Sequence, residues 1–327
     1  MAGRSDSART LDAYLTATLD EYLKTMHDNI FNRRVLLSWL NGTLGQATRG
    51  GSPKVSHSSG NDIIVPLMYG KNTTVKSYDG AELLDTTLQD GITNAKFSWA
   101  YYSGSVGLLG KEKRNNKGKH AILNLLQSKM TQLEMSFADK LNANLLASTR
   151  ASSKDVHALK DIISTSVTVG GLAPGTHTWW KPYTQTSVGG FSGAGIGMMR
   201  TAINTLNSRG GKGCDLIFTH QDVFEDYEDT QDGLKRYESK MVADAGFTSL
   251  TFKGIPMTFD AGAISGEMYF LNSENIKWEV HKEADMTMSA EGFQTPIGQD
   301  VSTAKILFQG NITVNNRRRL GVATGIS

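Results

Sequence analysis

The chain has 327 residues and a mass of 35.6 kDa, which is enough for about two domains or one elaborated domain. Hydrophobic residues make up 39% and charged residues 20%, which excludes a disordered polyelectrolyte. The 34 basic and 32 acidic residues leave a net charge of +2, which argues against binding nucleic acid through bulk charge. A single cysteine, Cys214, forms no internal disulfide, and no apolar run approaches the roughly 18 residues of a transmembrane helix. These features predict a folded protein of a reducing, aqueous compartment.

The first 60 residues predict a helix followed by an arm. Large apolar residues between Leu11 and Met26 recur at spacings of three and four, which is typical of an amphipathic helix. The segment 41–60 is rich in Gly, Ser, Thr and Asn and has no periodicity that would bury one face. We therefore expect an extended arm there.

Short β-prone runs broken by glycines follow between residues 61 and 109. The runs at 63–65, 73–75 and 97–102 favour strands, because they are rich in β-branched and aromatic residues. We expect the two legs of a long β-hairpin that ends in a polar excursion.

The strongest periodic signal lies between residues 119 and 147. Apolar residues recur there every three or four positions, which predicts a single helix of about 40 Å at 1.5 Å per residue. A coiled coil is disfavoured because Leu123 and Leu125 lie off the stripe and no steady charge flanks it. The stripe consists of Ile122, Leu126, Met130, Leu133, Phe137, Leu141 and Leu145.

The second half of the chain alternates helices and strands, which predicts an α+β protein without internal repeats. One helix has an apolar face from Ile196 to Leu206 and ends at the glycine pair 210–211, and a short acidic helix covers 221–232. Strands are expected at 215–219, 247–252, 255–259, 268–271, 276–280 and 306–314.

No group of residues has the spacing of a catalytic or metal site. The 7 histidines are scattered, and Cys214 stands at the entrance of an apolar strand, where a lone cysteine usually packs as a small hydrophobe. The glycine-rich segment 189–197 precedes a helix but lacks the lysine of a phosphate-binding loop, so we expect a flexible loop. We therefore expect no enzyme activity, no cofactor and no metal.

Two charged groups are the candidate contact sites. A basic group lies next to the long helix and an acidic run lies on the short helix at 221–232. Because complementary charges pair across interfaces, we expect both groups to make contacts between subunits. The triplet 317–319 adds three arginines, without a nucleic-acid-binding motif around it. The candidate contact residues are Lys111, Lys113, Arg114, Lys117, Glu225, Asp226, Glu228 and Asp229.

The order of these elements resembles the major capsid (coat) protein of tailed bacteriophages, which has the HK97-like fold. The aromatic run at 97–99, the basic turn at 113–118 and the long helix are similar to the extended hairpin, or E-loop, and the spine helix of that family. Further segments follow in the family's order. They are 158–163, 179–182, 214–219, 246–260, 268–272 and 309–319.

The resemblance implies a shell subunit that assembles into hexamers and pentamers of an icosahedral capsid around double-stranded DNA. It implies assembly in the host cytoplasm, a final location in the virion, and no membrane. The implied partners are further copies of the chain, a portal protein, scaffolding or decoration proteins, and packaged DNA contacted without sequence specificity. The implied parts are an N-terminal arm (1–60), an E-loop hairpin (61–115), a peripheral domain with the spine helix (116–157 and 266–316) and an axial domain (158–265 and 317–327).

A long helix, a projecting hairpin and an arm cannot all be buried within one compact monomer, so neighbours are needed to cover them. By the resemblance, the basic group lies at the base of the hairpin and the acidic run in the axial domain. A cross-link of the kind known in one branch of the family would use Lys71 or Lys76 with Asn315 or Asn316, but no supporting carboxylate is identifiable.

Two other functions are carried forward as alternatives. An encapsulin shell shares the fold but encloses enzymes instead of DNA. An α+β enzyme would depend on the glycine loop from Gly189 to Gly197 alone.

Overall fold

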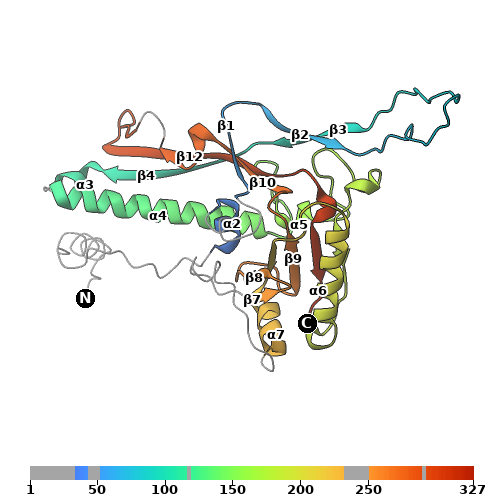
Figure 1. Cartoon of the computed structure of the whole chain (residues 1–327). Coiled ribbons are helices and arrows are strands. Elements are labelled where there is room, and N and C mark those ends of the chain that lie inside the picture. Colours follow the sequence, from blue (N-terminus) through green and yellow to red (C-terminus); the bar gives the residue numbers. More distant parts are fainter. Residues whose placement is uncertain (1–33, 43–51, 116–118, 232–249, 289–291) are drawn as a thin grey trace.

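The computed structural model describes residues 34–42, 52–115, 119–231, 250–288 and 292–327. Figure 1 shows an elongated molecule, with a long helix under a sheet at one end and a hairpin projecting from the other. A second sheet, flanked by helices, lies below the root of the hairpin. This mixture of helices and strands confirms the predicted α+β class. The helix predicted at residues 11–26 lies outside the described residues.

The predicted long helix is confirmed as α4, Lys119–Leu146, whose 28 residues span about 42 Å. From Met130 onward its apolar stripe faces the sheet above it, where Phe137, Leu141 and Leu145 are buried. Gly104 on the neighbouring strand permits this close packing. A Cβ atom added at Gly104 would lie 2.7 Å from Leu133 Cδ1, so a larger residue there would force the Leu133 side chain to move.

The sheet that packs on α4, here called the α4 sheet, has five strands. Its longest strand, β12, pairs antiparallel with β10 and with β4. On its inner face the Phe308 ring stacks on Trp278 with ring centroids 5.5 Å apart, and it contacts the Phe137 ring of α4 edge-on. The strands are β1 (Lys54–His57), β10 (Ile276–His281), β12 (Val301–Val314), β11 (Thr287–Met288) and β4 (Ala100–Leu109).

A second sheet of six strands is covered on one face by α6 (Phe191–Ser208) and α7 (Gln221–Gln231). Its central strand β6 is buried along its whole length, with Ile217 facing those helices and Phe218 facing a core shared with the α4 sheet. The strand order is β5 (Tyr183–Gln185), β13 (Gly321–Thr324), β9 (Glu267–Leu271), β6 (Leu216–Thr219), β8 (Ile255–Phe259) and β7 (Leu250–Phe252).

The projecting hairpin consists of β2 (Asp62–Met68) and β3 (Ile92–Ser98), which pair antiparallel from Asp62↔Ser98 to Met68↔Ile92. Residues 69–91 continue beyond the last pair as an extended tip without strands. Besides three 3-10 helices, at Thr178–Trp180, Lys282–Ala284 and Arg317–Arg319, the described residues form three short α-helices. They are α2 (Val35–Leu40), α3 (Gly110–Asn115) and α5 (Leu159–Ile162).

Part of the predicted arm belongs to the body of the molecule. Lys54–His57 forms β1, which pairs parallel with β10, and Pro53 O accepts a hydrogen bond from Trp278 N at 3.0 Å. Two side-chain contacts hold the strand in place, a hydrogen bond between His57 Nε2 and Glu279 and an ion pair between Lys54 and Asp285, each at 2.6 Å. The expectation of an extended arm over 41–60 is therefore wrong for this segment, because pairing with a distant strand leaves no periodic signal.

The predicted hairpin is also shorter than expected. The aromatic run at 97–102 divides at the buried Trp99: β3 returns to β2, whereas Ala100–Leu109 leaves the hairpin and pairs with β12. The expected strand at 73–75 is wrong, because Thr73 and Thr74 form a turn in the tip. Residues 100–109 therefore belong to the α4 sheet, since their partner strand lies about 200 positions further along the sequence.

Two boundaries in the second half differ from expectation. The segment expected to be a flexible loop, 189–197, is helical from Phe191 onward, because the buried Phe191 ring packs on the first turn against Gly195. The implied parts placed residues 266–316, and so strand β9, with the long helix in the peripheral domain. Strand β9 instead pairs with β6 and β13 in the six-stranded sheet.

Candidate assembly surfaces

The hairpin from Asp62 to Ser98, here called the hairpin arm, carries an unusual amount of exposed apolar surface. Nine of the fifteen large hydrophobic side chains exposed on the described part of the chain lie on it. Leu83 and Leu88 have exposed fractions of 93% and 98%. The others on the arm are Ile64, Met68, Tyr69, Val75, Tyr78, Leu84 and Ile92.

The exposed side chains of the arm gain nothing from the fold of a single subunit. Burial of one leucine side chain is worth about 1.5–3 kcal/mol, so covering several would stabilise an association strongly. Apolar surface of this kind on a soluble protein usually marks a contact with a partner. The interpretation of the tip as a polar excursion overlooked these residues, although the three leucines at 83, 84 and 88 are visible in the sequence.

The root of the arm, in contrast, is part of the core. Ile63, Leu67, Ala95 and Phe97 point inward and are buried, whereas alternate residues of both strands are exposed. The Trp99 indole N–H donates to Gly60 O at 2.9 Å where β3 ends. The arm is therefore fixed at one end and unsupported at the other.

The basic group lies at the opposite end of the molecule from the arm. Lys111 and Arg114 are on α3, which follows β4 at the far end of α4 (Figure 1). The expectation that this group lies at the base of the hairpin is wrong, because the 10 extended residues of β4 separate them by about 33 Å. The Arg114 guanidinium pairs with Asp300 at 2.7 Å, and both side chains are largely exposed. The Lys113 side chain and Lys117 lie outside the described part of the structure.

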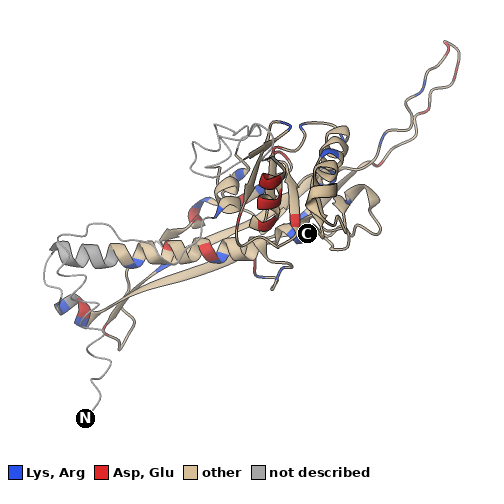
Figure 2. Ribbon diagram, turned by 90° about the horizontal axis from the view of Figure 1, so that it is seen from below, with Lys and Arg blue, Asp and Glu red and all other residues tan. Residues whose placement is uncertain are grey.

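The acidic residues gather on α7, as Figure 2 shows. Val223, Phe224 and Tyr227 anchor one side of the helix in the core, so the acids take the other side. Partial burial, together with repulsion from Asp222, Asp229 and Glu225, raises the pKa of Asp226. The acidic residues are Asp222, Glu225, Asp226, Glu228 and Asp229. Helices α7 and α3 lie far apart in one chain, so the two charged groups do not pair within it.

The arginine triplet does not form one charged patch. Arg317 is completely buried: its Nε donates to Ile162 O at 2.7 Å, its Nη2 donates to Ser164 O, and the guanidinium lies over the Trp180 ring. Burial lowers its pKa to about 10. Arg317 therefore caps the carbonyls at the end of α5 and is a structural residue, whereas Arg318 is exposed.

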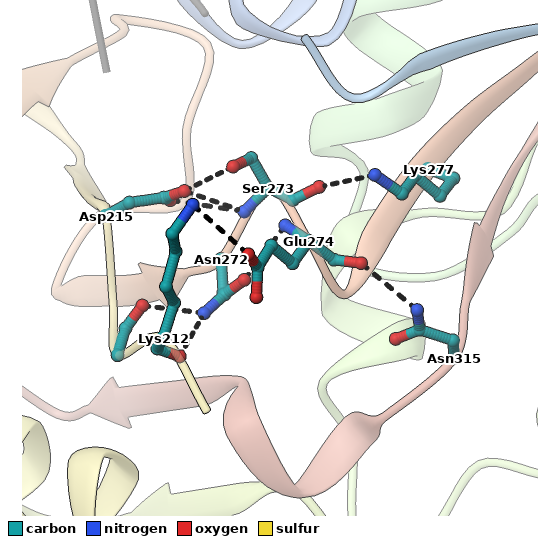
Figure 3. A network of polar contacts seen from close by, with 8 residues as sticks. Lys212, Asp215, Asn272, Ser273, Glu274, Lys277 and Asn315 are labelled. Carbon is teal, nitrogen blue, oxygen red and sulfur yellow. Dashed lines mark hydrogen bonds and ion pairs between the residues drawn. The ribbon is translucent and has the colours of Figure 1, made fainter. Parts of the chain in front are cut away.

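The link between β9 and β10 joins the two sheets through a polar network (Figure 3). The Asp215 carboxylate accepts hydrogen bonds from the backbone N–H and the hydroxyl of Ser273. The Asn272 amide donates to Lys212 O and Gly213 O at 2.8 and 2.6 Å, and the Asn315 amide donates to Glu274 O at 3.1 Å. Because these hydrogen bonds reach residues next to β6 and residues next to β12, the network ties the link to both sheets.

Two further groups that the sequence offered for chemistry, the Cys214 thiol and the start of the glycine-rich helix, make contacts within the fold. Burial raises the pKa of the Cys214 thiol, which donates to Leu216 O at 3.2 Å. The Phe191 N–H at the start of α6 donates to Ser327 O at 3.0 Å, so this donor is already used within the fold and is not available to bind a phosphate. Within the described ranges, no group of three or more His, Cys, Asp or Glu is placed to hold a metal ion. No helix described here is both long and apolar enough to cross a membrane.

Comparison with protein-family models and with curated protein sequences finds no match. Solved structures do match. The capsid asymmetric unit of cyanophage A-1(L) aligns with a TM-score of 0.67 and 15% identity, over 92% of this chain and 95% of that chain. The capsid of an empty GTA particle aligns with a TM-score of 0.59 and 8% identity, over 91% and 99% of the two chains.

An encapsulin complex from Synechococcus elongatus also aligns, with a TM-score of 0.56 and 9% identity over 100% of this chain and 97% of that chain. These similarities cover both partners almost completely. The chain therefore has the HK97-like fold, as its order of elements predicted.

Proposed function

We propose that this chain is the major capsid protein of a tailed bacteriophage, a subunit that assembles into the hexamers and pentamers of an icosahedral shell. One observation carries the proposal: a fold shared end to end with capsid subunits presents an apolar arm that its own subunit does not cover. In this proposal the role is structural, and the shell surrounds double-stranded DNA in the virion after assembly in the host cytoplasm.

The proposal assigns parts to the two sheets. The α4 sheet with α4 corresponds to the peripheral domain and its spine helix, the six-stranded sheet with α6 and α7 to the axial domain, and the hairpin arm to the E-loop. The chain's main partner is then another copy of itself. Portal, scaffolding and decoration proteins are further partners, and packaged DNA is contacted without sequence preference. The net charge of +2 suits a shell that surrounds DNA without binding its phosphates tightly.

The candidate contact residues remain part of this proposal. Exposed acids on α7 of one axial domain and exposed bases on α3 of another subunit are complementary in charge. Their separation within one subunit supports contacts between subunits over an internal pairing.

An encapsulin-type compartment is the second candidate, favoured by the complete alignment with the encapsulin chain. The experiment is to express the chain, image the product by electron microscopy, and analyse the contents of particles from the natural source. Closed shells holding nuclease-protected double-stranded DNA are expected. Shells that hold a protein cargo instead would select the encapsulin, and a protein that stays monomeric at all salt and protein concentrations would refute both.

A further inference from the structure

Two aromatic rings join the hairpin arm to the body of the molecule at the point where the pairing of β2 with β3 ends. The last pair of the ladder is Met68↔Ile92, and Tyr69 follows it directly. The Tyr69 ring stacks on Trp179 with ring centroids 5.5 Å apart and an interplanar angle of 24°. Trp179 belongs to a short 3-10 helix, Thr178–Trp180, about 110 positions away in sequence. This contact is therefore tertiary and lies where the arm leaves the body.

Trp179 is itself fixed by its neighbours. Its ring contacts the rings of His177 and Trp180 at centroid distances of 5.7 and 5.6 Å. Trp180 is buried, its indole N–H donates to Val169 O at 3.2 Å, and the buried Arg317 guanidinium covers its ring. The surface that receives Tyr69 is thus continuous with the core.

A second contact holds the opposite strand of the arm. Val169 and Leu172 exchange two backbone hydrogen bonds around Gly170 and Gly171, both with positive φ, which is a tight two-residue turn. At the tip of that turn, Gly170 O accepts a hydrogen bond from Lys96 N on β3 at 3.0 Å. A Cβ atom added at Gly170 would lie 2.6 Å from Ala95 Cβ, so the turn packs too closely on the arm for a side chain at this position.

We propose that the Tyr69–Trp179 stack and the Gly170 turn together form a clamp that sets the direction of the hairpin arm in the free subunit, before a second copy covers the arm. Two strands alone form a marginal unit in water, and the residues of the tip are exposed almost throughout. Holding the arm in one direction lowers the entropy that is lost when it binds. The inference rests on the proposed function, because it assigns the arm to contacts between subunits.

The clamp can be tested on the unassembled subunit, independently of shell formation. Cys214 is buried and is the chain's single cysteine, so spin labels will attach to introduced cysteines. Lys71→Cys places one label just beyond the stack, and Thr201→Cys places the other on the exposed side of α6. Pulsed electron paramagnetic resonance then measures the distribution of distances between the labels.

We expect a narrow distribution in the parent protein, and a distribution at least twofold wider in Trp179→Ala and in Tyr69→Ala. Trp179→Phe should restore the narrow distribution, because a ring remains to be stacked upon. Tyr78→Ala is the matched control: it removes an exposed tyrosine further along the arm and should leave the width unchanged. An unchanged width in both Trp179→Ala and Tyr69→Ala would overturn the clamp.

The result separates the clamp from the proposed function. If the widths respond as expected but the parent protein never assembles, the clamp stands and the capsid proposal fails. If shells form and the widths do not respond, the capsid proposal stands and the clamp fails. Trp179→Ala shells should also be fewer and less uniform than Trp179→Phe shells at equal subunit concentration.

Discussion

Replacing two leucines at the tip of the hairpin arm should separate assembly from folding. Leu83 and Leu88 are 93% and 98% exposed, so Leu83→Ser with Leu88→Ser removes almost no contact from the folded subunit. Exposed substitutions of this kind change the free energy of unfolding by about 0.5 kcal/mol or less. If a neighbouring copy buries both side chains, each contributes about 1.5–3 kcal/mol to the contact.

The double substitution should therefore cost the contact about 3 kcal/mol or more. Since 1.4 kcal/mol corresponds to about a tenfold change in an equilibrium constant, the concentration required for assembly should rise about 100-fold. Thermal melting of the dilute subunit measures folding, and light scattering against protein concentration measures assembly. Ile297→Ser is the matched control, because Ile297 is 104% exposed but lies outside the arm. An unchanged assembly threshold, or an equal rise in Ile297→Ser, would refute the role given to the arm.

Three further predictions concern the core, the charged groups and pH. Phe137→Ala should lower the free energy of unfolding by about 3–5 kcal/mol in a denaturant titration, because Phe137 is buried between α4 and β12, and a loss below about 1 kcal/mol would contradict this packing. Lys111→Glu with Arg114→Glu should leave the melting temperature nearly unchanged, because the exposed Arg114–Asp300 pair is worth about 0–1 kcal/mol. The same double substitution should lower the yield of particles, and an equal yield at all salt concentrations would show that the basic group is only solvated surface. Burial, together with the nearby Arg150 charge, lowers the pKa of His157 to about 4, below its ordinary value of 6.5. Folding therefore favours the neutral ring. The free energy of unfolding should fall, by at most about 3 kcal/mol, as the pH drops from 6.5 toward 4. Thermal melting between pH 7 and 5 should show this loss, and His157→Gln should flatten it; an equal slope in the variant would assign the dependence to other groups.

The sequence by itself determined the features that depend on local periodicity. The stripe from Met130 to Leu145 predicted α4 because a helix brings every third or fourth residue to one face, and that face is where Phe137 and Leu141 are buried. The apolar run at 216–219 predicted β6, and the acids interleaved with Val223, Phe224 and Tyr227 predicted α7. The order of these elements was also enough to indicate the HK97-like fold.

Only the tertiary structure decided which distant segments pair and which charged groups are accessible. Nothing local distinguishes Lys54–His57 from a linker, because its stability as a strand comes from β10, more than 200 positions away. Arg317 and Arg318 are identical neighbours in sequence, yet one is buried against Trp180 and the other is exposed, since only the fold places the α5 carbonyls within reach of one guanidinium. The same holds for the hairpin arm. Only the structure shows that Leu83 and Leu88 are exposed and are therefore candidates for a contact with a neighbouring copy, because hydrophobicity is a property of the side chain and burial is a property of the whole molecule.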